Sequence, residues 1–389
     1  MMNKKSCRAA VVIVAGSASM LSCKTRNFGS ANKAVTIPAT TVKDQGMVGF
    51  CWSYAAMGIL EGQYKKETGQ DLDLSEEYLG FWKIAELLAF VSQINEPNRS
   101  QTITERIKFL LEQNSATLEG SSFVEQGKKS YPFMLQALIQ KYGVMPQAAF
   151  TRKFNNDQTT QNQYWIEILQ RWNQSISART TPMTPQEIAT EILAGSAMFP
   201  KAPPHSFQLK GTSMTAQQFY QTLNLPLHEH VGFITRSRTD YDHLIQGIKL
   251  TLAKGQGAFL IVPFTSSMNT AAGVFGTGAG WENTLSQGGH AMIAVDYRNK
   301  GGTLGRSMSP EAETDKHPRE LEEIVVKNSW GSRILTAETT INFPPVAGVA
   351  GFFSINQGFL LSVSDSHFKG IHFGAMLPED TLRPPLNPY

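Results

Sequence analysis

Residues 44–52 read Asp44-Gln45-Gly46-Met47-Val48-Gly49-Phe50-Cys51-Trp52, and this stretch decides the expected fold. Its two glycines permit a tightly turned loop. After Cys51 the apolar side chains recur at helical spacing, and Gly69 follows them as a stop signal. The stretch therefore predicts a loop that leads into a helix beginning at Cys51.

The position of Cys51 suits a nucleophile. A thiol attacks a carbonyl well only as the thiolate, and a helix N-terminus stabilises that anion. Gln45 lies six residues earlier, on a loop that can fold back, so its amide and the Cys51 N–H are candidate oxyanion donors. The other two cysteines, Cys7 and Cys23, fall in an N-terminal export segment, which would leave Cys51 without a disulfide partner. Such a cysteine either packs in the core as a small apolar residue or is chemically reactive. The residues that flank Cys51 favour a reactive thiol.

A histidine and an asparagine far along the chain complete a candidate catalytic set. His290 stands in Gly288-Gly289-His290-Ala291-Met292, at the expected start of an apolar strand, and should be exposed enough to act as the base. Asn328, in Lys327-Asn328-Ser329-Trp330-Gly331, can orient the imidazole through its other nitrogen. Trp330 can cover that hydrogen bond and exclude water.

In this order the motifs resemble the papain family of cysteine peptidases. The stretches 74–82 and 141–146 further resemble the bleomycin hydrolase and bacterial aminopeptidase branch. The resemblance implies an α+β, papain-like two-domain fold. A helical left domain would carry Cys51, and a β-barrel right domain would carry His290 and Asn328, with the cleft between them.

The chain also departs from the family's pattern. Val48 replaces the cysteine of the usual disulfide near the nucleophile, and Lys129-Ser130 stands where the family has paired glycines that bind substrate backbone. By resemblance, Ser130, Gly289 and Trp330 are the expected substrate-binding residues. Substrate specificity is therefore open.

Composition and motif positions together predict the domain organisation. Asn, Gln and Thr are abundant in 155–163, and a helix start is marked at Thr184-Pro185-Gln186-Glu187, which indicates an inserted, partly helical subdomain. The expected segments are 1–22 (signal peptide), 23–35 (linker), 36–150 (left domain), 151–240 (insert), 241–365 (right domain) and 366–389 (Pro-rich tail).

The N-terminal segment reads as an export signal. Three basic residues precede an apolar run, which ends in Met20-Leu21-Ser22-Cys23. That ending resembles a bacterial lipobox and predicts lipidation of Cys23. An exported bacterial protein, lipid-anchored in the periplasm or outer membrane, is therefore expected. Ordinary cleavage nearby, or a short helix of the folded domain, is the alternative.

Net charge and composition limit the kinds of molecule that the chain is expected to bind. The formal charge of +3 equals the three basic residues of the signal segment, and no basic run suggests nucleic-acid binding. His228 and His230 flank Glu229 without further ligand-type residues nearby, so no metal site is expected, nor any cofactor. No apolar stretch after the N-terminus is long enough to predict a membrane span.

The resemblance to cysteine peptidases implies a peptide or protein substrate.

The main functional hypothesis is thiol-dependent hydrolysis of peptide bonds, by an endopeptidase or an aminopeptidase. Amide or acyl transfer to an acceptor other than water is the enzymatic alternative. A catalytically silent peptide-binding module on the same fold is the alternative from another class. Thiol reactivity distinguishes them, because an activated Cys51 would titrate well below the ordinary thiol pKa of about 8.5.

Overall fold

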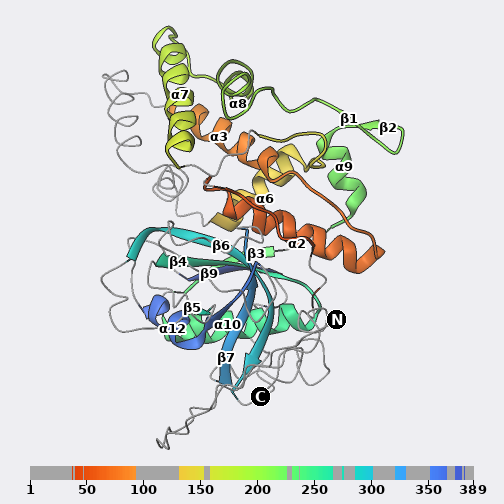
Figure 1. The fold of residues 1–389 in the computed structure, drawn as a ribbon, viewed down its shortest axis with the longest axis vertical. Helices are drawn as coiled ribbons and strands as arrows, with labels where there is room; N and C mark the ends of the chain where they lie inside the picture. Colours follow the sequence, from red (N-terminus) through yellow and green to blue (C-terminus); the bar gives the residue numbers. More distant parts are fainter. Residues whose placement is uncertain are drawn as a thin grey trace, which may run out of the picture.

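The computed structural model has a helical part and a sheet part, with helix α2 between them (Figure 1). It describes residues 37, 40–46, 48–92, 131–152, 158–225, 230–235, 237–265, 274–275, 285–300, 320–329, 351–365, 373–378 and 381. The elements in chain order are α2 (Cys51–Thr68), α3 (Glu76–Ser92), α6 (Tyr131–Tyr142), α7 (Gln158–Ser177), α8 (Pro185–Glu187), the π-helix η1 (Ile188–Leu193), β1 (Phe207–Leu209), β2 (Thr212–Met214), α9 (Ala216–Leu223), β3 (His230–Ile234), α10 (Arg238–Ala253), β4 (Ala258–Thr265), β5 (Val274–Phe275), β6 (Leu285–Asn299), β7 (Leu321–Lys327), β8 (Phe352–Asn356), α12 (Gln357–Asp365) and β9 (Gly374–Pro378).

Helix α2 forms the centre of the molecule. Every residue from Trp52 to Gln63 is buried, as expected for a helix enclosed by other elements on all sides. The helix begins at Cys51, which confirms the prediction. It ends at Gly69, whose left-handed φ of 71° lets its N–H reach the carbonyl of Lys65.

Other helix ends follow the usual capping rules, and the helix start predicted at Thr184 is confirmed. Ser75 caps α3, since its hydroxyl accepts a hydrogen bond from the Tyr78 N–H at 3.1 Å. Thr184 and Glu187 form a reciprocal capping box at the start of α8. Gly143 follows α6 with a φ of 76°.

The sheet has seven strands in the order β3-β9-β4-β6-β7-β8-β5. All neighbouring pairs are antiparallel except β5 and β8. The apolar stretches 258–262, 291–295, 324–326 and 351–355 of the sequence lie in or at the start of β4, β6, β7 and β8. Within the described residues β3 and β5 are the two edges, so the expected barrel is present as an open sheet. Helices α10 and α12 lie against it (Figure 1).

The sheet extends beyond the expected boundaries of the right domain. β3 lies before residue 241 and β9 lies after residue 365, and the two pair with each other from His230 opposite Pro378 to Ile234 opposite Gly374. β9 also pairs with β4, so it lies inside the sheet. A five-residue strand that ends in proline gives little signal in sequence. The rest of the described insert, through Leu225, lies in the helical part (Figure 1).

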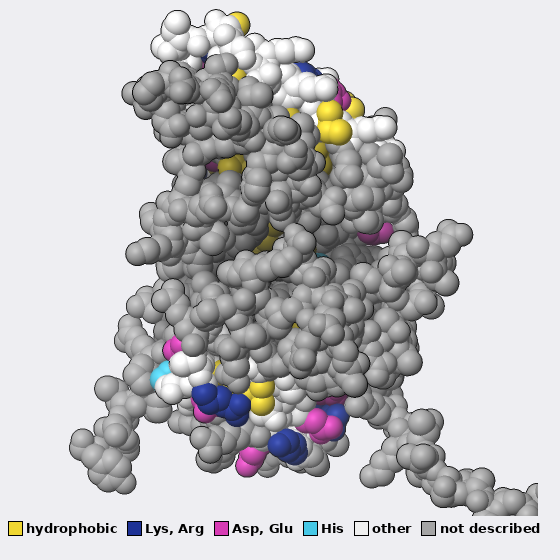
Figure 2. Space-filling view, turned by 90° about the vertical axis from the view of Figure 1, so that its left-hand side faces the viewer, with side chains coloured by type: hydrophobic (Ala, Val, Ile, Leu, Met, Phe, Trp, Pro, Cys, Tyr) yellow, Lys and Arg dark blue, Asp and Glu magenta, His cyan; other side chains and the backbone are white. Residues whose placement is uncertain are grey.

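The described surface carries charges of both signs. On the face in Figure 2, basic and acidic side chains are interspersed at the lower end. This agrees with the similar totals of 35 basic and 32 acidic residues in the chain. No helix in the described ranges is long and apolar enough to cross a membrane.

Two helical glycines let neighbouring elements approach closely. A Cβ added at Gly80 of α3 would lie 2.4 Å from the ring of Phe50, the residue before Cys51. A Cβ added at Gly58 of α2 would lie 2.5 Å from the Cδ1 atom of Ile293 in β6. The first obstacle is a fully buried ring, whereas the second is the tip of a flexible side chain.

Gly80→Ala should therefore lower the free energy of unfolding by about 1–3 kcal/mol, because the Phe50 ring cannot move without disturbing the core. Gly58→Ala is the matched control and should stay within about 1 kcal/mol of wild type, since the gain in helix propensity offsets a small shift of Ile293. Urea denaturation measures both. Equal losses for the two variants would contradict this assignment.

Candidate active site

Cys51 is the first residue of α2 and is half-buried. No side chain caps this helix start, and no acidic residue lies in its first turn. Its first backbone N–H groups therefore keep their partial positive charge at the thiol's end of the helix. A helix start of this kind favours the thiolate form of a cysteine.

His290 and Asn328 meet through the pairing of β6 with β7. His290 Nε2 lies 2.7 Å from Asn328 Oδ1. Two expectations about this histidine are wrong. It lies inside β6 and not at its start, because the strand begins at Leu285 and continues through Gly289, which pairs with Pro263 of β4. It is also 5% exposed, because the sheet and its neighbours enclose it.

The main chain fixes the orientation of the Asn328 amide. The Ser329 N–H donates to Asn328 Oδ1 at 2.7 Å, and an N–H can only donate, so this atom is the acceptor oxygen. His290 Nε2 therefore carries the proton that it shares with Asn328. In neutral imidazole the other ring nitrogen, Nδ1, is then unprotonated and can accept a proton.

Burial controls the charge of His290. It lowers the pKa of the imidazole to about 4, and the hydrogen bond to Asn328 opposes this only in part. Burial alone thus favours neutral imidazole at pH 7. An imidazolium–thiolate pair requires the negative charge on Cys51 to offset the desolvation.

Gln45 is held by hydrogen bonds on all sides. Its backbone N–H donates to the Ser329 carbonyl at 2.8 Å, and its Oε1 accepts from the Ser329 hydroxyl at 2.5 Å. One hydrogen of its Nε2 goes to the carbonyl of Val48 at 2.8 Å. An amide nitrogen carries two hydrogens, so the second Nε2 hydrogen can donate to another acceptor, as an oxyanion donor must.

Ser329 was quoted in the sequence motif, but no role was predicted for it. It contacts both Asn328 and Gln45, and so connects the base side of the site to the oxyanion side. Its position directly after Asn328 was the available signal. The partner 284 positions away could be found only from the fold.

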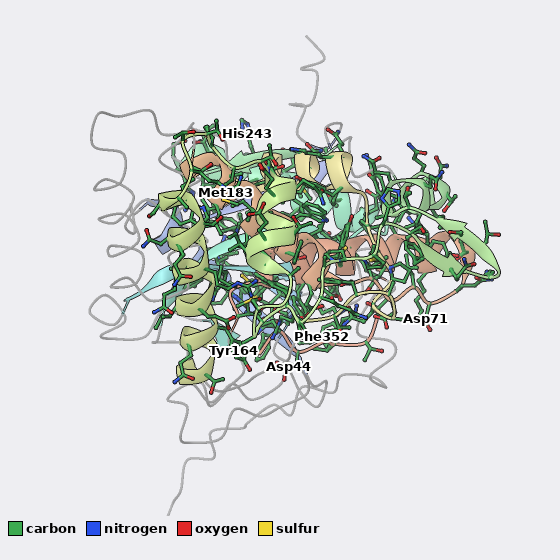
Figure 3. All side chains as sticks on the ribbon, turned by 90° about the horizontal axis from the view of Figure 1, so that it is seen from above. Asp44, Asp71, Tyr164, Met183, His243 and Phe352 are labelled. Carbon is green, nitrogen blue, oxygen red and sulfur yellow. The ribbon has the colours of Figure 1, made fainter. Side chains whose placement is uncertain are left out.

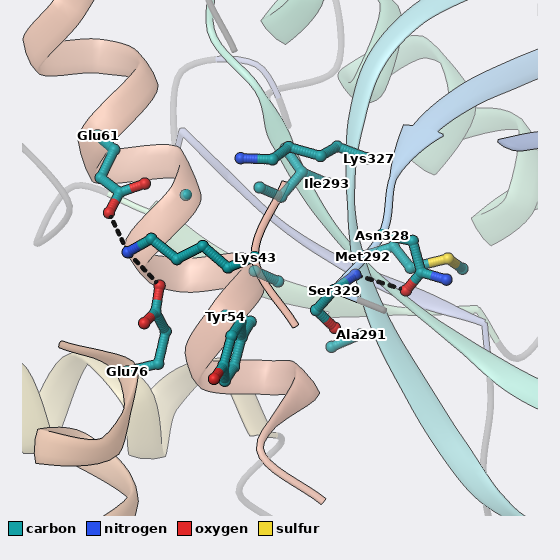
Figure 4. Close-up of a pocket in the computed structure, with 12 residues that line it drawn as sticks. Lys43, Tyr54, Glu61, Glu76, Ala291, Met292, Ile293, Lys327, Asn328 and Ser329 are labelled. Carbon is teal, nitrogen blue, oxygen red and sulfur yellow. Dashed lines mark hydrogen bonds and ion pairs between the residues drawn. The ribbon is translucent and has the colours of Figure 1, made fainter. Parts of the chain in front are cut away.

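A cluster of charged side chains lies to one side of Asn328 and Ser329 (Figure 4). Lys43, two positions before Gln45, places its Nζ 2.7 Å from Glu61 of α2 and 2.8 Å from Glu76 of α3. Burial lowers the pKa of Lys43, but the carboxylates of Glu76 and Glu61 more than offset this and raise it. Lys43 therefore stays charged and anchors the loop that carries Gln45.

Lys327 belongs to the same cluster and directly precedes Asn328. Burial lowers the pKa of its ammonium to about 8, and Glu61 opposes that shift. Its Nζ donates to the Thr40 hydroxyl at 2.9 Å, which in turn donates to Glu61 at 2.7 Å. A cavity of about 10 Å³, room for one water molecule, lies among these groups (Figure 4).

The start of β8 lies against the segment that precedes α2, since a Cβ on Gly351 would lie 2.4 Å from Val42. Phe352 and Asp44, which follow these two residues in the chain, lie in the same region of Figure 3. The Gly351 carbonyl also accepts the Asn328 N–H at 2.9 Å, so the start of β8 supports the end of β7 that carries the site.

Several predicted residues lie outside the described part of the chain. These are Ser130 and Trp330, proposed to bind substrate, Cys23 with the whole signal segment, and His228. In the described ranges no group of three or more His, Cys, Asp or Glu residues could hold a metal ion.

Comparison with known proteins identifies the family of the chain. Residues 8–241, more than half of the chain, match the Peptidase C1-like family. The chain belongs to this family. Its matched range includes Gln45 and Cys51, whereas His290 and Asn328 lie beyond it.

Individual relatives of this C1-like chain match over short segments. It is 55% identical over 40 residues to a cathepsin L-like peptidase of Aedes aegypti, covering 10% of the chain and 12% of that protein. It is 30% identical over 121 residues to aminopeptidase E of Lactobacillus helveticus, covering 31% of the chain and 25% of that protein. These matches thus span 12% and 25% of the length of the two relatives.

A solved structure shows the fold over nearly the whole chain. PepW from Lactobacillus rhamnosis superimposes with a TM-score of 0.50 at 15% identity, covering 90% of this chain and 82% of that one. The expected papain-like α+β fold is thus confirmed.

In a Cys51→Ala variant, His290 should titrate near pH 4, because no thiolate then offsets its burial. NMR titration of labelled histidines measures this, and His290→Gln in the same background assigns the signal. The pKa in the folded state lies below the unfolded value of about 6.5, so the unfolded chain binds the proton first. The variant should therefore lose about 3 kcal/mol of stability as the pH falls from about 6.5 to 4. Titration above pH 6 would contradict the assignment.

Proposed function

We propose that this chain is a cysteine peptidase that hydrolyses peptide bonds. The observation that supports the proposal most strongly is the Asn328 amide, held between the Ser329 N–H and His290 Nε2. It leaves the Nδ1 atom of His290 for the thiol in the proposed reaction. Membership of the Peptidase C1-like family supports the same reaction class.

In the proposed reaction the Cys51 thiolate attacks the peptide carbonyl carbon. The second Nε2 hydrogen of Gln45 and the Cys51 N–H stabilise the oxyanion. The C–N bond breaks as His290 Nδ1 gives its proton to the leaving amine, which leaves an acyl-enzyme. Water, deprotonated by Nδ1, then attacks this thioester, and the C–S bond breaks to restore the thiolate.

We further propose that the substrate is cleaved near its N-terminus. The support is the 30% identity to aminopeptidase E over 121 residues, which agrees with the resemblance to the aminopeptidase branch. A substrate with a free α-amino group should then be hydrolysed in preference to its N-acetylated form. The opposite preference would favour an endopeptidase.

The test is the pH dependence of Cys51 labelling by iodoacetamide, together with turnover of a mixed fluorogenic peptide library. The wild type should be labelled rapidly below pH 7, well under the ordinary thiol pKa of about 8.5. Turnover should disappear in Cys51→Ser. His290→Ala should slow labelling and lower kcat by about 10²- to 10⁴-fold.

The matched control is His243→Ala, which removes an exposed imidazole on α10, far from Asp44 in Figure 3. It should leave both measurements unchanged. Slow labelling of Cys51 without turnover would instead identify a silent peptide-binding module. Release of product only with an added amine would identify an acyl transferase.

We also propose export with a lipid anchor on Cys23, a proposal supported by the Met20-Leu21-Ser22-Cys23 ending of the N-terminal segment. Cells fed with radiolabelled palmitate should incorporate label into the wild type and not into Cys23→Ala. Cys7→Ala is the control and should be labelled like the wild type. Label retained in Cys23→Ala would refute the anchor.

A further inference from the structure

Arg152 lies buried beside the loop that carries Gln45. Its side chain is 1% exposed, and its Nη2 donates a hydrogen bond to the Gln45 carbonyl. The two residues are 107 positions apart. No sequence motif marked Arg152, which stands alone between a threonine and a lysine.

The segment that presents Arg152 is itself fixed. Two residues earlier, the Phe150 carbonyl accepts a hydrogen bond from the Ser75 hydroxyl at 2.7 Å. The Phe150 ring packs edge-on against Phe81 of α3, with centroids 5.6 Å apart. The guanidinium is therefore held in place from the α3 side, independently of Gln45.

A carboxylate compensates the buried charge. Arg152 Nε lies 3.5 Å from Glu77 Oε1, which also accepts the Tyr54 hydroxyl hydrogen at 2.8 Å. Burial and the charge of Glu77 raise the pKa of Tyr54, so this phenol stays protonated and acts as the donor. Arg152, Glu77 and Tyr54 form one buried network that ends on the Gln45 carbonyl.

This contact adds the backbone carbonyl to the groups of Gln45 that are hydrogen-bonded. Ser329 holds its backbone N–H and its Oε1, Val48 holds one amide hydrogen, and Arg152 holds its carbonyl. The peptide between Gln45 and Gly46 is held on both sides, because its N–H donates to Asp44 Oδ1 at 2.8 Å and its carbonyl accepts from Arg152. Loss of the guanidinium removes the hydrogen bond on the carbonyl side, next to Gly46, whose φ of 61° glycine adopts without strain.

We propose that Arg152 is a positioning residue, which acts through Gln45 to aim the amide at the oxyanion. The proposal rests on the proposed peptidase function. The orientation of the Gln45 amide matters only in the transition state, where negative charge develops on the carbonyl oxygen. A change in this orientation therefore changes kcat and leaves KM nearly constant. Lysine cannot replace the fork-shaped guanidinium, because one ammonium cannot serve the Gln45 carbonyl and Glu77 in the same geometry.

The test is a double-mutant cycle in the full chain, using a peptide that the wild type hydrolyses. Arg152→Lys should lower kcat about 10- to 100-fold, with KM within about two-fold of wild type. The same substitution in a Gln45→Ala background should have almost no further effect. Alkylation of Cys51 by iodoacetamide forms no oxyanion, so its rate should be unchanged.

Arg171→Lys is the matched control. Arg171 also donates to main-chain carbonyls, those of Glu191 and Ala194, but in another part of the helical region. It should leave kcat unchanged. If Arg152→Lys does not fold, as thermal unfolding would show, the charge-neutral pair Arg152→Met with Glu77→Gln replaces it in the cycle.

A loss of kcat that persists undiminished in the Gln45→Ala background would overturn the positioning role, as would an unchanged kcat in Arg152→Lys. Either result would leave the peptidase function intact, since the wild type would still hydrolyse the peptide. A wild type that shows neither turnover nor rapid alkylation of Cys51 would overturn the proposed function and the positioning role together.

Discussion

Two hydrogen bonds between Gln45 and Ser329 join the halves of the site, and its geometry depends on them. Gln45 precedes the helix that carries Cys51, whereas Ser329 follows the strand that ends beside His290. If this contact is lost, the Gln45 amide and the Asn328 amide are no longer fixed relative to each other. Ser329 therefore couples two elements that belong to different parts of the fold.

Buried charges surround that contact. Lys43 and Lys327 flank Gln45 and Asn328 in sequence, and both reach toward Glu61 inside the α2 helix. Buried ion pairs of this kind give little net stability, because desolvation offsets their attraction. They do penalise misplacement strongly, since a displaced partner leaves an unpaired charge. The cluster thus defines how the loop and the sheet meet α2.

The sequence by itself determined the local elements and the candidate site residues. A glycine-bearing loop before Cys51, a capped helix after Ser75 and short apolar strands are local patterns, and the structure contains each of them. Three ordered motifs also indicated which side chains carry the chemistry. Local geometry suffices here because capping and periodicity depend on neighbours a few positions apart.

Only the tertiary structure decided the environment of those groups. The burial of His290, the place of β9 inside the sheet, and the contacts of Ser329 and Arg152 with Gln45 join residues separated by tens to hundreds of positions. A sequence shows which polar groups exist, but burial decides which of them must find partners. Those partners come from wherever the fold places a donor or a charge. The site's residue types were therefore readable from the chain, whereas its charge state and alignment were not.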